Sequence, residues 1–264
     1  MRFKINLYRN GRGKFLPINY QYELSSLIYK IIDQTDTGFA QYLHDHGYSV
    51  AGKTFRLFNF SRLSFDKYKV YGAEKRIEHQ GRMASFYISF LVDRAAEEFI
   101  KGLFMNQQLW LGDKFTQIQY EVSGIESCER PVFLEKMKYR CLSPILIKQK
   151  RTTRGEDYLE PTDKDYIDIL AYNLGSKAQA FALSVNDVGF KEHSPHVNLQ
   201  LNGKVYKKGV EIKQHTDAAT QLIGYTYEFE LTAPTELHEI GYYAGFGHLN
   251  SQGFGCVEVK QRFL

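Results

Sequence analysis

The sequence has few cysteines and no long apolar run, and both absences narrow the class of protein. Only three cysteines occur in 264 residues, at positions 128, 141 and 256, and none forms a C-x-x-C pair. Such sparse thiols are typical of a reduced, intracellular protein rather than of a disulfide scaffold. No segment is apolar for long enough to span a membrane, and the N-terminus has no signal-peptide pattern. We therefore expect a cytoplasmic protein without a membrane partner.

Net charge is also small, at +4, so bulk charge does not indicate a nucleic-acid-binding protein. The charges are nevertheless unevenly spread. Seven basic residues and no acidic residue lie between Lys136 and Arg154, and six acidic residues lie between Glu156 and Asp168. Together with 19 Tyr and 19 Phe, the basic run suits single-stranded nucleic acid, whose phosphates need cations and whose bases stack on rings. The alternative is that both runs are solvated faces of a loop.

Nucleotide-binding fingerprints are missing, although glycine is concentrated near the end of the chain. Five of the 21 glycines fall between Gly241 and Gly255. A helix-like segment precedes this loop and a strand-like segment follows it, whereas dinucleotide sites run from strand to helix and a P-loop ends in Gly-Lys-Ser/Thr. Glycine lets the backbone approach another group closely. We therefore expect exposed backbone N–H groups in this loop to bind phosphate oxygens; the alternative is a long turn with a capping glycine.

Hydrophobic periodicity in the first half predicts strand, helix, strand, strand, helix, strand. The strands are expected at 2–8, 55–63 and 83–91, with a further strand or hairpin at 110–122, and the main helices at 21–34 and 93–105, the second with Asp93 as N-cap. A shorter helix is expected at 38–46. This order is the split βαβ, ferredoxin-like pattern.

The second half repeats that order more loosely. We expect strands at 138–148, 222–231 and 254–260, helices at 162–183 and 234–243, and a hairpin turning at Asn202-Gly203. The fold class is therefore α+β, with two tandem ferredoxin-like (RRM-like) domains. The predicted domains are residues 1–125 and 126–264, and the glycine loop lies between the last helix and the last strand of the second.

The stretch Gly245-Phe-Gly-His-Leu-Asn-Ser-Gln-Gly-Phe-Gly-Cys-Val-Glu-Val resembles the C-terminal loop of the CRISPR-associated repeat-RNA processing endoribonucleases, which belong to the RAMP superfamily. The similarity extends to Met1-Arg-Phe-Lys-Ile, Leu-Ile-Tyr29-Lys-Ile-Ile, Tyr-Leu-His44 and Lys53-Thr-Phe, so it covers essentially the whole chain. The resemblance implies a metal-independent endoribonuclease with no cofactor. Such an enzyme cuts CRISPR precursor transcripts within the repeat by 2′-OH attack, giving a 2′,3′-cyclic phosphate and mature guide RNAs. In one branch a Tyr, a His and a Lys carry the chemistry, matched here by Tyr29, His44 and Lys53.

Helical phase gives a separate argument for two of these residues. Tyr29 lies well away from the centre of the apolar stripe of its helix and shares a polar face with Tyr22 and Ser25. In the next helix His44 points away from the inward side, whereas His46 is expected to face inward with Tyr42. His44 is therefore the preferred proton-transfer residue, although a histidine in a last helical turn is also favoured by the helix dipole alone.

RNA contacts are expected from the glycine loop, the basic run and one strand residue. The predicted RNA-binding residues are Gly245, Gly247, His248, Asn250, Ser251, Gly253, Gly255, Lys148, Lys150, Arg151, Arg154 and Arg56. The expected partners are CRISPR repeat RNA and proteins of a CRISPR effector complex, with the chain a monomer or homodimer. The main alternative is a non-catalytic RAMP subunit that binds guide RNA in an effector complex; a general RNA-binding protein of tandem RRM-like units is a third reading.

Overall fold

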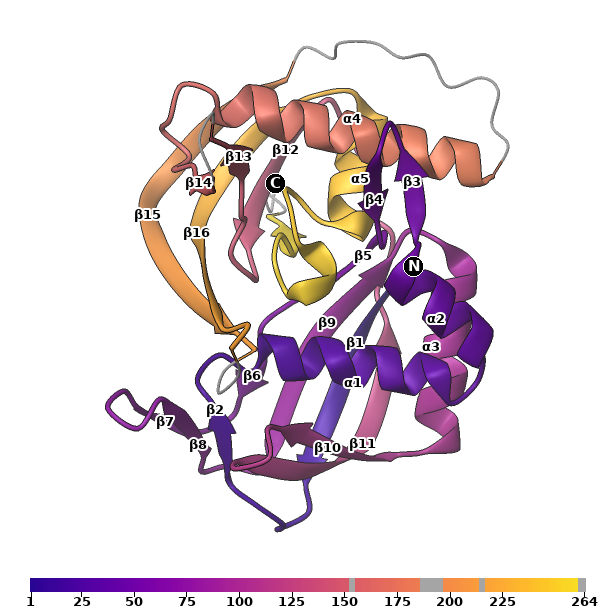
Figure 1. Ribbon diagram of the computed structural model, residues 1–264, viewed down its shortest axis with the longest axis vertical. Coiled ribbons are helices and arrows are strands. Elements are labelled where there is room, and N and C mark those ends of the chain that lie inside the picture. Colours follow the sequence, from indigo (N-terminus) through magenta and orange to yellow (C-terminus); the bar gives the residue numbers. More distant parts are fainter. Residues whose placement is uncertain (152–154, 186–196, 214–216, 261–264) are drawn as a thin grey trace.

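The computed structural model describes residues 1–151, 155–185, 197–213 and 217–260. Its helices are α1 (Gln21–Asp33), α2 (Thr37–Asp45), α3 (Asp93–Met105), α4 (Tyr166–Ser184) and α5 (Thr235–Ala244), with a short 3-10 helix η1 (Asn250–Gln252). Figure 1 shows two sheets with their helices, one above the other, and the yellow glycine loop between them. No helix within the described ranges is long and apolar enough to cross a membrane.

The first sheet is an antiparallel ferredoxin-like sheet. Its strands are β1 (Arg2–Arg9), β5 (Phe58–Phe60), β6 (Ser64–Phe65), β9 (Met83–Phe90), β10 (Gln108–Gly112) and β11 (Gln117–Ser127). The order is β10-β11-β1-β9-β5, with β6 also paired to β9. In α1 an apolar stripe ending in Ile31 and Ile32 is buried, and in β1 the alternate residues Ile5 and Leu7 are buried, so sequence periodicity explains how both elements pack.

The second sheet repeats this arrangement. Its strands are β12 (Lys136–Cys141), β15 (Asn198–Ile212), β16 (Thr220–Thr232) and β17 (Val257–Val259), in the order β15-β16-β12-β17. Helix α4 follows β12 and α5 follows β16, as the ferredoxin-like order requires. The predicted α+β class with two ferredoxin-like units is thus confirmed. The domain boundary after residue 125 stays a prediction; β11 continues to Ser127 and pairs there with Phe3 of β1.

Three small sheets are inserted into these units. The hairpin β3 (Tyr48–Val50) and β4 (Lys53–Phe55) follows α2 and projects onto α4 in Figure 1. A sheet of β2 (Phe15–Pro17), β8 (Arg76–His79) and β7 (Tyr68–Tyr71) extends from the other end of the first unit. The pair β13 (Lys148–Lys150) and β14 (Glu156–Tyr158) lies between β12 and α4.

Several local predictions were wrong, among them the continuous strand at 138–148, since β12 ends at Cys141 and β13 begins at Lys148. Asn202-Gly203 does not turn a hairpin, because β15 continues through it and pairs with β16 on both sides, with a register shift between Asn202 and Tyr206. Gly203 has φ +89°, so the glycine serves a bulge rather than a turn. At the start of α3, the N-cap is Val92 and Asp93 is the first helical residue.

Buried polar contacts join the two units. The Arg2 guanidinium, 4% exposed, donates from Nη1 to the Val257 carbonyl oxygen at 2.7 Å and lies 4.5 Å from the Tyr242 ring centroid. Asn59 of β5 donates from Nδ2 to the Tyr243 carbonyl oxygen at 2.9 Å. Because such contacts fix both partners, the end of α5 and the glycine loop are held against the first unit.

Candidate active site

The rings of Tyr29 and His44 meet where the ends of α1 and α2 come together. Their centroids are 5.3 Å apart at an interplanar angle of 81°, an edge-to-face contact. Tyr29 is half-buried, and its ring also packs against that of Phe58, with 5.6 Å between the two ring centroids. The His44 side chain is 69% exposed, and its Nδ1 lies 2.7 Å from Asp45 Oδ1. That contact orients the imidazole and leaves Nε2 for proton exchange with a substrate.

Arg56 lies between these two residues. Its Nη2 donates to the backbone carbonyl oxygen of His44. Burial raises the pKa of Tyr29, and the neighbouring side chains of Ser251 and Arg56 oppose that rise. The structure therefore places Arg56, which the sequence assigned to the RNA path, beside the two predicted proton-transfer residues.

The expectation for His46 was wrong. Only Phe39, Ala40 and Leu43 of α2 are buried, while Tyr42 is 40% exposed and His46 is also exposed. The helix ends at Asp45, so His46 already lies at its C-cap, where its ring centroid is 6.4 Å from that of Tyr42. His44 does point away from the buried side of α2, as its helical phase predicts.

Lys53 has a different neighbour. Its Nζ lies 3.6 Å from the centroid of the Tyr172 ring, which belongs to α4, in a cation–π contact. The ammonium is also close enough to lower the pKa of His248 in the glycine loop, after burial, Lys177 and Lys148. The structure thus brings Tyr29 and His44 into ring contact, whereas Lys53 lies at the junction of the β3–β4 hairpin with the second unit.

Several backbone amides of the glycine loop are hydrogen-bonded within the protein. Among its backbone amides, Gly245 donates to Gly241, Phe246 to Gly255, His248 to Leu146, and Gly255 to Pro144. Gly245, Gly247, Gly253 and Gly255 are all buried. These four amides already have carbonyl acceptors and do not serve as donors to a phosphate; phosphate binding by other amides of the loop stays a prediction.

Two buried side chains hold the loop in this shape. Lys177 of α4 donates from Nζ to the carbonyl oxygens of Gly245 at 2.6 Å and Gly247 at 2.7 Å, and to Asn250 Oδ1 at 2.7 Å. Asn250 Nδ2 in turn donates to the carbonyl oxygens of Phe246 and Phe254. A Cβ on Gly255 would lie 2.0 Å from the Phe246 carbonyl oxygen, so the glycines allow the loop to close around Asn250.

The rim of the loop faces α1. The Ser25 hydroxyl donates to the Ser251 carbonyl oxygen at 2.6 Å, and the Ser251 side chain lies close enough to Tyr29 to oppose the rise in its pKa. His248 and Ser251 are partly exposed. The polar face of α1 predicted from the sequence therefore contacts the glycine loop, and the loop reaches the Tyr29–His44 pair through Ser251.

Two cations of the basic run are paired with carboxylates of the acidic run that follows it. Across β13 and β14, Lys148 Nζ lies 2.8 Å from Glu156 Oε1 and Arg151 Nη2 lies 2.5 Å from Asp157 Oδ1. Lys150 is exposed on the same strand. Arg154 lies outside the described residues. Two of the four predicted phosphate contacts are therefore already partnered by carboxylates.

Models of one protein family match both halves of the chain. "CRISPR-associated protein Cas6, N-terminal" matches residues 15–123, and "CRISPR associated protein Cas6, C-terminal" matches residues 128–259. The chain belongs to the Cas6 family.

Curated Cas6 proteins and solved structures support the same assignment. "CRISPR-associated endoribonuclease Cas6" of Pyrococcus furiosus is 28% identical and aligns with 98% of this chain and 90% of its own length. "CRISPR-associated endoribonuclease Cas6 1" of Methanocaldococcus jannaschii is 26% identical, over 97% and 92%. The structure titled "Characterization of a Cas6-related gene from Pyrococcus furiosus" has a TM-score of 0.81 at 22% identity, covering 99% of both chains, which shows a shared fold.

Sequence reasoning missed the loop's internal support. Lys177 lies three residues after Leu174 and seven after Leu170, on the buried stripe of α4. A lysine in that phase is a signal that its ammonium has acceptors inside the protein. The contact with Tyr172 had no comparable signal, because it joins Lys53 to a helix of the other unit.

Proposed function

We propose that this chain is an endoribonuclease that cuts CRISPR precursor transcripts within the repeat. The observation that carries the proposal is the meeting of Tyr29, His44 and Arg56 beside the rim of the glycine loop. The names of the curated relatives support the substrate and the reaction class. A subunit that only binds RNA has no need for an exposed imidazole in contact with a half-buried tyrosine.

The reaction requires one proton to leave the 2′-hydroxyl and one to reach the leaving oxygen. The 2′-oxygen attacks the neighbouring phosphorus, the bond from phosphorus to the 5′-oxygen breaks, and the products are a 2′,3′-cyclic phosphate and a 5′-hydroxyl. His44, with Nε2 free of the Asp45 contact, exchanges one of these protons. The Tyr29 hydroxyl is the second group in reach, either as proton donor or as a hydrogen-bond donor to the phosphate.

Positive charge at the phosphorus is the remaining requirement, because charge on the phosphate oxygens grows in the transition state. Arg56 supplies it closest to the ring pair. Its guanidinium is held by the His44 carbonyl oxygen, and its other N–H groups can donate to a phosphate. Lys53 supplies a second cation on the side of α4 and His248.

Repeat RNA would approach along the line where α1 meets the glycine loop. Ser251 and His248 on the rim are placed to contact it, while the buried glycines and Asn250 support the rim from below. Lys150, the exposed cation of β13, would neutralise a phosphate further along. The partners of this activity are repeat RNA and, through the guide RNAs produced, effector-complex proteins.

The test is cleavage of labelled repeat RNA in excess EDTA. We expect a single cut with a cyclic-phosphate end, lost in His44→Ala and retained in His46→Ala. Tight binding without cutting of any repeat RNA would instead support the non-catalytic subunit. Cutting that survives His44→Ala and fails in His46→Ala would overturn the assignment of the proton-transfer histidine.

A further inference from the structure

The small sheet β2-β8-β7 presents one outer face on which aromatic rings and cations are interleaved. Cross-strand pairing gives its two rows: Phe15 faces Glu78, which faces Lys69, and Pro17 faces Arg76, which faces Tyr71. Residues directly opposite one another in an antiparallel sheet lie on the same face. We call this set, with Lys14 beside it, the ring–cation face.

Its rings and cations contact one another directly. The Arg76 guanidinium carbon lies 4.3 Å from the Phe15 centroid and 5.6 Å from that of Tyr71. Lys69 Nζ lies 4.9 Å from the Tyr71 centroid, and Lys14 Nζ lies 5.2 Å from the Phe15 centroid. The rings themselves are 6.1 Å apart, edge to face. The guanidinium and ammonium groups thus lie over the Phe15 and Tyr71 rings in cation–π contacts.

The opposite face anchors the sheet to the first unit. Leu16, Ile77 and His79 are buried. His79 Nδ1 lies 3.0 Å from the Tyr120 hydroxyl, and its Nε2 lies 3.0 Å from Asp66 Oδ1.

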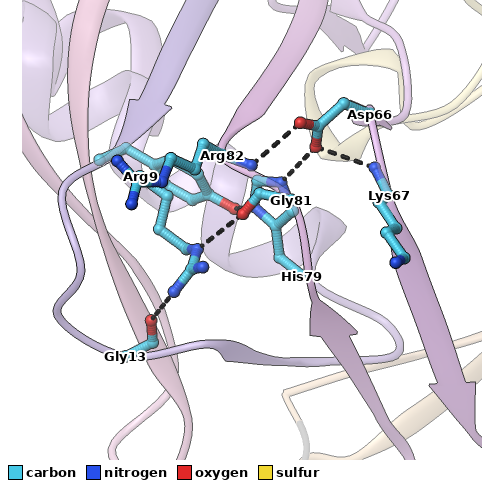
Figure 2. A network of polar contacts seen from close by, with 8 residues as sticks. Arg9, Gly13, Asp66, Lys67, His79, Gly81 and Arg82 are labelled. Atoms are coloured by element: carbon cyan, nitrogen blue, oxygen red, sulfur yellow. Dashed lines mark hydrogen bonds and ion pairs between the residues drawn. The ribbon is translucent and has the colours of Figure 1, made fainter.

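The loops that flank the sheet are held as well. Figure 2 shows the Asp66 carboxylate accepting from the amides of Lys67 and Arg82, at 2.8 Å and 3.0 Å. It also shows the Arg9 guanidinium donating to the carbonyl oxygens of Gly81 and Gly13, at 3.0 Å and 3.3 Å. The turn after β7 is tied to β15 by Lys75 and Glu211, 3.1 Å apart. A surface fixed in this way loses little conformational entropy on binding.

Charge on and around the ring–cation face favours a polyanion. The face carries Lys14, Lys69 and Arg76 against one carboxylate, Glu78, which is bonded to Lys14 at 2.9 Å. Lys69 is exposed and has no carboxylate within ion-pair distance among the described residues. The neighbouring Lys67, which is also exposed, adds to the positive charge.

We propose that the ring–cation face binds single-stranded RNA outside the nucleotides at the cut, so that the transcript is held at a second place. Phosphates would meet Lys69 and Arg76, and unpaired bases would stack on Tyr71 and Phe15. The proposal rests on the proposed function for the identity of the RNA. In Figure 1 the β2-β8-β7 sheet lies toward the N-terminal end of α1, whereas Tyr29 belongs to the C-terminal half of that helix.

Binding of a repeat RNA with its flanks, and of the same RNA shortened stepwise from either end, tests this proposal. A 2′-deoxy nucleotide at the cut prevents cleavage during the measurement. For Lys69→Glu and Tyr71→Ala we expect about tenfold weaker binding of the long RNA and, for Lys69→Glu, a salt slope lower by about one. Once the RNA is too short to reach the ring–cation face, wild type and variants should bind it with equal affinity. The cleavage rates of the variants at saturating enzyme should equal that of wild type.

Lys164→Glu is the matched control, because Lys164 is also exposed but lies between Asp163 and Asp165. It should bind the long RNA like wild type. Equal affinities and equal salt slopes of Lys69→Glu and wild type for every RNA would overturn the proposal. Lys69→Glu changes an exposed side chain, so it remains decisive even if Tyr71→Ala fails to fold. If the wild-type protein binds repeat RNA but does not cut it, the proposed function fails. The comparison of RNA binding by wild type and Lys69→Glu then still tests whether the ring–cation face binds RNA.

Discussion

The Arg56 guanidinium donates to the backbone carbonyl oxygen of His44 and lies close enough to Tyr29 to oppose the rise in the pKa of its hydroxyl. One cation, from the segment between β4 and β5, therefore lies beside the two residues whose rings are in contact. The three side chains are best tested separately, each with a substitution that keeps the packing.

Replacing Tyr29 with Phe removes only the hydroxyl. The ring contacts with Phe58 and His44 remain, so the free energy of unfolding should change little. We expect the single-turnover cleavage rate to fall about a hundredfold, with RNA affinity nearly unchanged. Tyr42→Phe is the control, since Tyr42 is an exposed tyrosine on another side of α2, and it should cut at the wild-type rate. A Tyr29→Phe protein that cuts normally would remove the hydroxyl from the mechanism.

Replacing Arg56 with Gln removes the cation but keeps a hydrogen-bond donor. We expect about a hundredfold slower cleavage and an intermediate rate for Arg56→Lys, which keeps the charge without the planar fork. Because Arg56 lowers the pKa of Tyr29, any alkaline limb of the pH–rate profile due to Tyr29 should move to higher pH in Arg56→Gln. Arg130→Gln, which breaks an ion pair with Glu239, is the control. Unchanged rate and profile in Arg56→Gln would assign the guanidinium a packing role.

Periodicity alone predicted both ferredoxin-like units and the outward phase of His44. It could not predict where Arg56 points. The sequence indicated one strand from Phe55 to Leu63, but the structure breaks it at Leu57, which is buried with φ +53°. Leucine rarely adopts a left-handed conformation, so nothing local signals the break that directs Arg56 toward Tyr29.

The glycine loop shows a second limit of local reasoning. Its glycine density indicated close backbone approach, and the approach is real, but the groups approached belong to the protein. Lys177 and Pro144 supply bonds from distant parts of the sequence. Likewise, opposite charges adjacent in sequence fold onto each other across β13 and β14. In both places, groups that the sequence predicted to be exposed have partners in the folded protein, and these partners lie far away in the sequence or on the neighbouring strand.

Replacing Lys177 with Met should destabilise the protein. Two backbone carbonyl oxygens and Asn250 Oδ1 would lose their donor in a fully buried place. We expect the free energy of unfolding to fall by about 3 kcal/mol in urea titrations, with weaker RNA binding because the rim loses its support. Lys164→Met, at an exposed position, should stay within about 0.5 kcal/mol of wild type. A loss below about 1 kcal/mol for Lys177→Met would show that the loop keeps its shape without the ammonium.

His248 should make stability depend on pH. Burial, and then the charges of Lys177 and Lys148, lower the pKa of His248 from its usual 6.5 to about 4. Between these values the unfolded chain binds a proton that the folded chain does not, so stability is complete above pH 6.5 and falls as the pH drops toward 4. The loss attributable to His248 is about 3 kcal/mol.

Urea unfolding of wild type and His248→Gln at several pH values between 4 and 7.5 isolates this contribution, since the carboxylates titrate equally in both proteins. The wild-type curve should fall more steeply on acidification, with the two curves converging by about 3 kcal/mol toward pH 4. Parallel curves would mean that His248 takes up its proton as readily in the folded protein as in the unfolded chain. In that case the imidazole would be solvated and, near neutral pH, could join His44 as a proton donor. The predicted difference in slope therefore also decides whether the loop histidine belongs to RNA binding alone.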